Sequence, residues 1–215
     1  SVKKSDSILK LLLLSGIIIS FIANWITAIP VIGIYFLWGI EYNNAPIEWK
    51  NIPTLGWLVN SVVGILLFIT GWILGMSNSI HRGIFFISLD TLYYMLPYFL
   101  SFSSISLLTT LRFGKGDNTD TDESIHYFGF SSSLFISFFM ICSALYFSLI
   151  HGDPLASTAT MVSLPFFIFA TVRRLNKDIL RAIRYPIFIF NFFCSTYYPW
   201  LFLPLFFTYY VSKYY

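Results

Sequence analysis

The chain has 215 residues, of which 57% are hydrophobic and only 11% are charged, and its formal net charge is +3. A soluble globular domain carries about 25% charged residues, so this composition excludes an ordinary soluble domain and predicts an all-α protein that crosses a membrane several times. The apolar runs are continuous rather than alternating, which excludes a membrane β-barrel.

Seven stretches are long and apolar enough to be membrane crossings, and together they predict one helical bundle over residues 1–215. They lie near residues 8–24, 27–41, 54–76, 91–111, 127–150, 154–172 and 185–212. If the polar stretches between them alternate sides, eleven of the 13 basic residues share one side, and only Arg82 and Lys213 lie on the other. Lys and Arg resist translocation, so the crowded side is predicted to be cytoplasmic. Topology then explains the basic residues, which give no indication of a nucleic-acid partner.

The first two crossings are predicted to form a hairpin. Asn24 and Trp25 mark its turn, and Pro30 can open the second helix, where its missing N–H costs nothing. The chain starts at Ser1, and a charged stretch leads from there into the first crossing. We therefore expect the chain to be the later part of a longer bundle.

The third crossing carries residues that are unusual on a lipid-facing helix. Asn60 lies near its cytoplasmic end, where an amide either bonds a neighbouring helix or lines a cavity. Gly71 and Gly75 form a Gly-x-x-x-Gly step, which permits close packing of a second helix.

The fourth crossing is dense in Ser and Thr along its second half. Polar groups in hydrocarbon must find internal partners, so we expect Ser103, Ser106 and Thr110, together with Asn60, to face the interior of the bundle. The loop that follows, residues 112–123, is the most polar segment of the chain. Its four acids within seven residues are compatible with a metal site and equally with a solvated acidic loop.

The fifth and sixth crossings are predicted to form a hairpin around residues 151–154. After them, residues 173–184 form a basic amphipathic stretch, with Leu175, Ile179 and Ile183 at i, i+4 and i+8 on one face. This pattern predicts a helix lying at the cytoplasmic interface, with the last crossing starting near Pro186. The basic residues of the stretch could hold a diphosphate, but topogenic charges facing anionic lipid are the favoured interpretation.

Several segments, in this order, resemble the UbiA family of intramembrane prenyltransferases. Residues 39–46 with 49–53 are similar to the loop after the family's fourth helix, and residues 56–60 with 64–72 are similar to its fifth helix. Residues 108–111 followed by Gly116-Asp117 resemble the second Asp-rich motif, and Asp153-Pro154 with residues 164–167 resemble the hairpin of the seventh and eighth helices. The resemblance covers essentially the whole chain, but only the last seven of about nine family helices.

The resemblance implies transfer of an isoprenoid chain from a prenyl diphosphate to a lipophilic, often aromatic, acceptor. In such proteins cytoplasmic Asp-rich loops hold Mg²⁺, which prefers carboxylate and phosphate oxygens and stabilises the departing diphosphate as a Lewis acid. Basic side chains take up the remaining phosphate charge. The metal candidates here are Asp117, Asp120 and Asp122, and the substrate-binding candidates are Tyr42, Lys50, Asn60, Arg112, Lys115, Arg173 and Arg174.

Two departures from the family pattern leave enzymatic activity open. The first Asp-rich motif would lie before Ser1, and Phe113 stands where the second motif should begin with Asp. The alternative is therefore a catalytically silent UbiA-like homologue that keeps the bundle and binds a lipid or a protein partner. An unrelated transporter fits less well, because the sequence has no internal repeat and no charged residue clearly at mid-bilayer.

Overall fold

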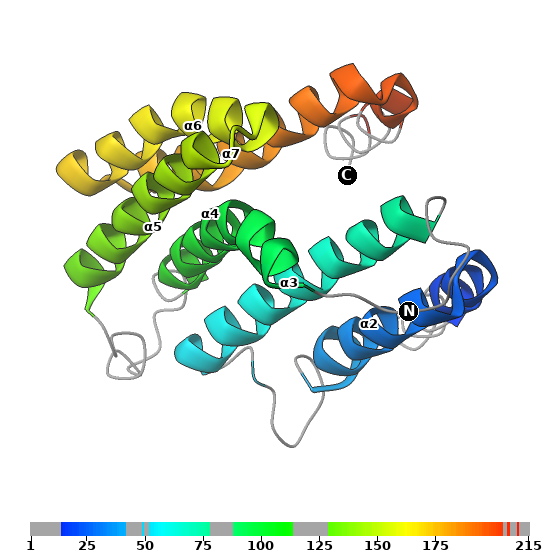
Figure 1. Ribbon diagram of the computed structural model, residues 1–215. Helices are drawn as coiled ribbons and strands as arrows, with labels where there is room; N and C mark the ends of the chain where they lie inside the picture. Colours follow the sequence, from blue (N-terminus) through cyan, green and yellow to red (C-terminus); the bar gives the residue numbers. More distant parts are fainter. Residues whose placement is uncertain are drawn as a thin grey trace. The chain divides into compact units, whose positions relative to one another are not determined.

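The structure is a computed structural model that describes residues 14–41, 49, 52–77, 88–113, 129–203, 206 and 210 (Figure 1). These residues are helical almost throughout, and none of them forms a strand. After a helix over Leu14–Ala23, the elements are η1 (Trp25–Thr27), α2 (Ala28–Ile34), the π-helix η2 (Tyr35–Glu41), α3 (Pro53–Ser77), α4 (Leu89–Phe113), α5 (Phe130–Ile150), α6 (Pro154–Arg173), α7 (Asn176–Tyr197) and η5 (Pro199–Leu201).

In the described part of the chain, four helices are long and apolar enough to cross a membrane, and they coincide with four of the predicted crossings. They are Thr54–Gly75, Leu89–Leu111, Phe130–Ile150 and Pro154–Arg173. The first two predicted crossings coincide with shorter apolar helices, over 14–23 and 25–40. The described part of the chain thus shows an all-helical protein with four membrane-length helices, and seven crossings remain a prediction.

The predicted boundary near Pro186 was wrong, because α7 runs without interruption from Asn176 to Tyr197. The basic stretch and the start of the predicted last crossing are therefore one helix. A proline inside a helix costs about 3 kcal/mol. The buried face of α7, with Ile179, Ala182 and Ile183 at 7% exposure or less, gives packing that offsets this cost.

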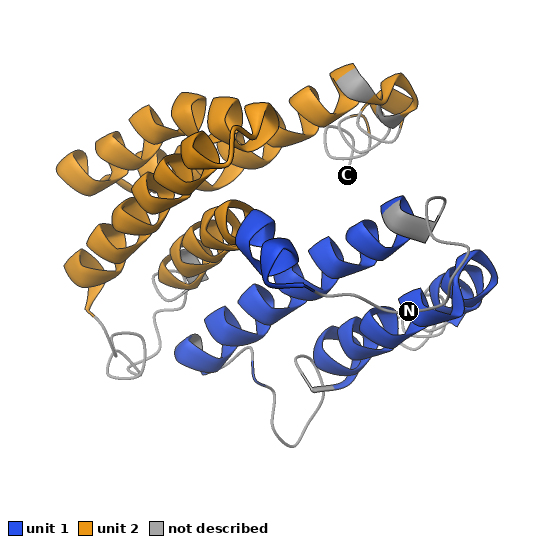
Figure 2. Cartoon of the chain, in the orientation of Figure 1, with its two compact units in different colours: residues 1–95, 123–127 blue, residues 96–122, 128–215 orange. Residues whose placement is uncertain are grey.

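The chain divides into two compact units (Figure 2). Unit 1 consists of residues 1–95 and 123–127, and unit 2 consists of residues 96–122 and 128–215. The division falls inside α4. Both units are helical, and the single domain expected from the sequence stays a prediction.

In unit 1, α2 and η2 pack against α3. A Cβ added to Gly33 of α2 would lie 3.2 Å from Leu66 Cδ1 of α3, so this glycine lets the two helices approach closely. Farther along α3, the ring of Trp72 stacks on Phe68 and on Tyr94, with centroid distances of 6.0 and 6.3 Å. Apart from its chain neighbours and the nearby backbone of α3 itself, a Cβ added at Gly71 or Gly75 would have no described atom within 4 Å.

In unit 2, one apolar core joins four helices. It contains Leu108 and Leu111 of α4, Leu134 and Ile141 of α5, Phe167 and Ala170 of α6, and Ile179, Ala182 and Ile183 of α7. Small polar residues allow α4 and α5 to meet. Ser104 Oγ donates to the carbonyl oxygen of Ser137 at 2.8 Å, and Ser137 Oγ donates back to the carbonyl oxygen of Ser104 at 3.2 Å.

The turn between α5 and α6 follows from local sequence signals. Gly152 has φ +62°, a left-handed conformation that glycine adopts without steric cost, and it ends α5. Asp153 caps α6, because its Oδ1 accepts from the backbone N–H groups of Leu155 and Ala156 at 2.9 and 3.0 Å. Pro154 then occupies the first position of the helix, where a proline is tolerated. The predicted hairpin around residues 151–154 is confirmed.

Candidate functional site

Most of the predicted site residues lie outside the described part of the chain. This holds for Asp117, Asp120 and Asp122, and also for Tyr42, Lys50 and Lys115. Arg112 lies in the last turn of α4, with its side chain outside the description. Among the residues that are described, no group of three His, Cys, Asp or Glu side chains could hold a metal ion. The proposed magnesium ligands therefore stay predictions.

Asn60 bonds a neighbouring helical segment, one of the two roles expected for it. Its Oδ1 accepts a hydrogen bond of 2.9 Å from Trp38 Nε1, which connects α3 to the π-helix η2 within unit 1. The indole N–H of Trp38 and the amide oxygen of Asn60, which would each be costly to leave unpaired in hydrocarbon, thus satisfy each other.

Arg173 and Arg174 lie together where α6 ends, in unit 2. The guanidinium of Arg173 lies 4.8 Å from the ring centroid of Phe169, one turn earlier on the same helix. Arg174 has φ 54° and its N–H donates to the carbonyl oxygen of Ala170 at 3.0 Å, so its backbone closes the helix. Both side chains are exposed, which leaves both charges accessible to an anion.

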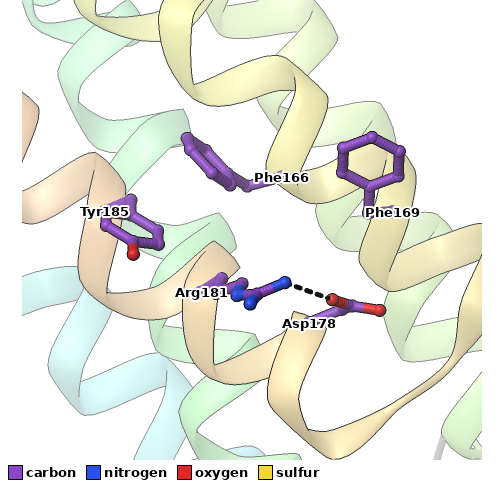
Figure 3. Close-up of a pocket in the computed structure, with 5 residues that line it drawn as sticks. All are labelled: Phe166, Phe169, Asp178, Arg181 and Tyr185. Atoms are coloured by element: carbon purple, nitrogen blue, oxygen red, sulfur yellow. Dashed lines mark hydrogen bonds and ion pairs between the residues drawn. The ribbon is translucent and has the colours of Figure 1, made fainter.

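Next to these arginines, α6 and α7 form an open pocket with a volume of about 290 Å³. Its lining consists of Phe166, Phe169, Asp178, Arg181 and Tyr185 (Figure 3). The rings of Phe166 and Tyr185 stack across the two helices, with centroids 4.7 Å apart and an interplanar angle of 23°. One end of the pocket is therefore aromatic and the other carries an acid and a base.

The charged end of the pocket contains an ion pair whose two side chains differ strongly in exposure. Arg181 Nη1 donates to Asp178 Oδ1 at 3.2 Å, as the dashed line in Figure 3 marks. The Asp178 side chain is 2% exposed, whereas that of Arg181 is 53% exposed. Asp178 Oδ2 is buried and has no hydrogen-bond partner among the described residues. The carboxylate lies in the first turn of α7, where the positive end of the helix dipole favours an anion.

Sequence reasoning missed this pocket. It treated residues 173–184 only as a basic amphipathic stretch, although the i, i+3 spacing of Asp178 and Arg181 on a helix is a visible signal for an ion pair. The burial of Asp178 and the stacking of Phe166 on Tyr185 depend on how α6 and α7 align, and no local pattern reports that.

The hydroxyl groups predicted to face the interior are in large part buried in unit 2. Ser103 is fully buried and Ser106 is 6% exposed, as expected. Thr110 is half-buried, and its hydroxyl donates to the carbonyl oxygen of Leu107 at 2.7 Å. Within the described residues Ser106 Oγ has no hydrogen-bond partner. The inner face of α4 thus combines buried hydroxyl groups with the apolar side chains of Leu107, Leu108 and Leu111.

Comparison with protein-family models, with curated proteins and with solved structures finds no match to this chain.

Proposed function

We propose that this protein is a membrane-embedded, UbiA-like prenyltransferase that moves an isoprenoid from a prenyl diphosphate to a lipophilic, in particular aromatic, acceptor. In this proposal the chain contributes the last seven of about nine crossings, and the face rich in Lys and Arg is cytoplasmic. The support is the order of the segments that resemble the family, together with four helices of membrane length.

The observation that carries the proposal is the course of α4. Its inner face is lined by the buried hydroxyls of Ser103, Ser104 and Ser106, and the helix ends at Phe113, four residues before Asp117. An acidic segment of the sequence therefore follows directly on a membrane-length helix that buries hydroxyl groups beside apolar side chains. This order suits a substrate with a charged head at the membrane surface and an apolar tail between helices.

In the proposed site Mg²⁺ would neutralise the charge that develops on the departing diphosphate. Asp117 is the first candidate ligand, and Asp120 and Asp122 are candidates to replace the carboxylate that Phe113 removes. Arg112 and Lys115 precede Asp117 in the sequence and would contact the phosphates. Arg173 and Arg174 are exposed cations at the end of α6 and would add to the positive potential that attracts the diphosphate.

The test is an assay of the full-length protein with prenyl diphosphates, aromatic acceptors and Mg²⁺. One well-placed electrostatic contact is worth about 10²–10³ in rate, so Asp117→Ala should slow transfer by about that factor. Asp120→Ala and Asp122→Ala, compared in parallel, show whether the metal site has shifted along the loop. Normal turnover by Asp117→Ala would remove this ligand assignment.

A specific feature favours a second candidate, the catalytically silent homologue. A phenyl ring cannot ligate Mg²⁺, and Phe113 stands at the first position of the second Asp-rich motif. If the parent protein turns over none of the prenyl donors with any of the acceptors, the silent homologue replaces the enzyme as our proposal.

A further inference from the structure

The pocket between α6 and α7 contains the guanidinium of Arg181, which contacts Asp178 on one side and is exposed on the other. A guanidinium carries five N–H donors in a rigid fork, and the ion pair with Asp178 is a single contact of 3.2 Å. With 53% of the Arg181 side chain exposed, donors remain available to a ligand. Asp178 fixes the direction in which they point.

Because Asp178 is buried beside it, Arg181 differs from an arginine that only sets the membrane topology. An arginine that only resists translocation needs no acid beside it, and removing a carboxylate from water costs several kcal/mol. Here the acid is 2% exposed and one of its oxygens has no partner among the described residues. A cost of this kind is typical of a group that positions another group rather than one that adds stability.

The pocket changes from charged to apolar along the helix axis. Phe166 lies seven residues before Arg173, the last residue of α6, and at 1.5 Å per residue this is about 10 Å deeper in the hydrophobic span. Its partner Tyr185 is 45% exposed, so the aromatic end opens on a surface of unit 2 rather than in its interior. With α6 placed across a membrane, this surface lies at the depth of acyl chains.

We propose that this pocket binds the phosphate head group of an anionic membrane phospholipid. Arg181 donates to the phosphate oxygens in a charge-assisted contact, and the aromatic rings flank the upper part of the acyl chains. Two exposed cations on either side of the connection between α6 and α7, Arg173 and Lys177, raise the local concentration of anionic lipid. The proposal rests on the membrane placement of α6 and does not depend on prenyl transfer.

The experiment measures lipid binding to the purified full-length protein by native mass spectrometry, with phosphatidylglycerol and phosphatidylcholine as probes. We expect phosphatidylglycerol to bind about tenfold more tightly than phosphatidylcholine. Arg181→Gln should remove that preference, since one charge-assisted hydrogen bond corresponds to about a tenfold change or more. Arg184→Gln removes the same charge from the same helix outside the pocket, and it should change binding less than twofold. Equal effects of both substitutions would reduce the site to a diffuse basic patch and overturn the proposal.

Asp178→Asn best distinguishes a positioned guanidinium from a diffuse basic patch. It raises the net charge by one unit, so a diffuse basic patch would bind phosphatidylglycerol more tightly. A positioned guanidinium instead loses its ionic anchor, and we expect binding several-fold weaker than in the parent. Binding that is unchanged or tighter would overturn the proposal.

Arg181→Lys keeps the inference testable if Asp178→Asn does not fold, as judged by circular dichroism and gel filtration. It retains the charge and loses the planar fork, so we expect binding several-fold weaker, and unchanged binding counts against the site.

Farnesyl diphosphate serves as a competitor to identify the source of the phosphate. If it displaces phosphatidylglycerol from the parent protein at lower concentration than free phosphatidylglycerol does, the pocket is a prenyl diphosphate site and the phospholipid assignment fails.

Discussion

The two units differ in how their helices are packed. In unit 1, 22% of the residues in the apolar span of α3 are buried, whereas in unit 2 the figure is 33% for both α5 and α6. Unit 2 places small residues at its contacts, and Ala144, Ala170 and Ala182 are at most 1% exposed. Lipid tails are as apolar as leucine, so helices in a membrane associate through close packing and hydrogen bonds rather than through hydrophobic burial. We infer that unit 2 is the more stable of the two.

Their polar contacts differ in the same way. In unit 2 the reciprocal bonds of Ser104 and Ser137 join two helices at fully buried positions. Asp153 caps α6 and also accepts from the hydroxyl of Tyr98 on α4. In unit 1 the side-chain bond from Trp38 to Asn60 joins residues that are exposed or half-buried. The buried hydrogen bonds of unit 2 should contribute more to stability than the exposed bond of unit 1, because leaving a buried polar group unpaired is costly.

The largest effect is expected at the centre of unit 2. Phe167→Ala removes a ring that is 1% exposed in the core of four helices, and such a cavity costs about 3 kcal/mol or more. Phe139→Ala on α5, where the ring is 72% exposed, should change the free energy of unfolding by less than about 0.5 kcal/mol. Equilibrium unfolding in mixed detergent micelles measures both. Similar costs for the two variants would contradict the assignment of the core.

An intermediate effect is expected at the junction of α4 with the turn between α5 and α6. Asp153→Ala deletes a helix cap and a side-chain hydrogen bond, which together should lower the free energy of unfolding by about 2 kcal/mol. Tyr98→Phe deletes only the second contact and should cost about 1 kcal/mol. The double variant should cost less than the two single costs added together, because the residues share one bond. Full additivity of the costs would show that the bond contributes nothing to stability.

The smallest effect is expected in unit 1. Trp38→Phe removes the donor to Asn60 and keeps most of the apolar ring. Hydrogen bonds between transmembrane side chains contribute about 0.6 kcal/mol on average, so the variant should lose about that amount. Trp25→Phe is the matched control, since Trp25 is 60% exposed, and it should be neutral. A loss above about 2 kcal/mol for Trp38→Phe would reverse the ranking of the two units.

Much of the helical architecture could be predicted from the sequence. The crossings over 54–76, 91–111, 127–150 and 154–172 coincide with membrane-length helices within three residues at every end. Continuous apolar runs decide this, since a backbone in hydrocarbon must satisfy its own hydrogen bonds. The turn at Gly152 and Asp153 and the burial of Ser103 and Ser106 were equally accessible, because each follows from one residue type in a local pattern.

Local patterns failed where packing competes with them. Pro186 is a legitimate helix-start signal, but it lies inside α7, because the buried face formed by Ile179, Ala182 and Ile183 extends the helix through it. The tertiary structure alone decided that Asn60 meets Trp38 and that Phe166 stacks on Tyr185. It also decided that the acid at Asp178 is buried beside an exposed arginine. Each of these contacts depends on the relative rotation and height of two helical segments, and side-chain packing between segments sets those quantities.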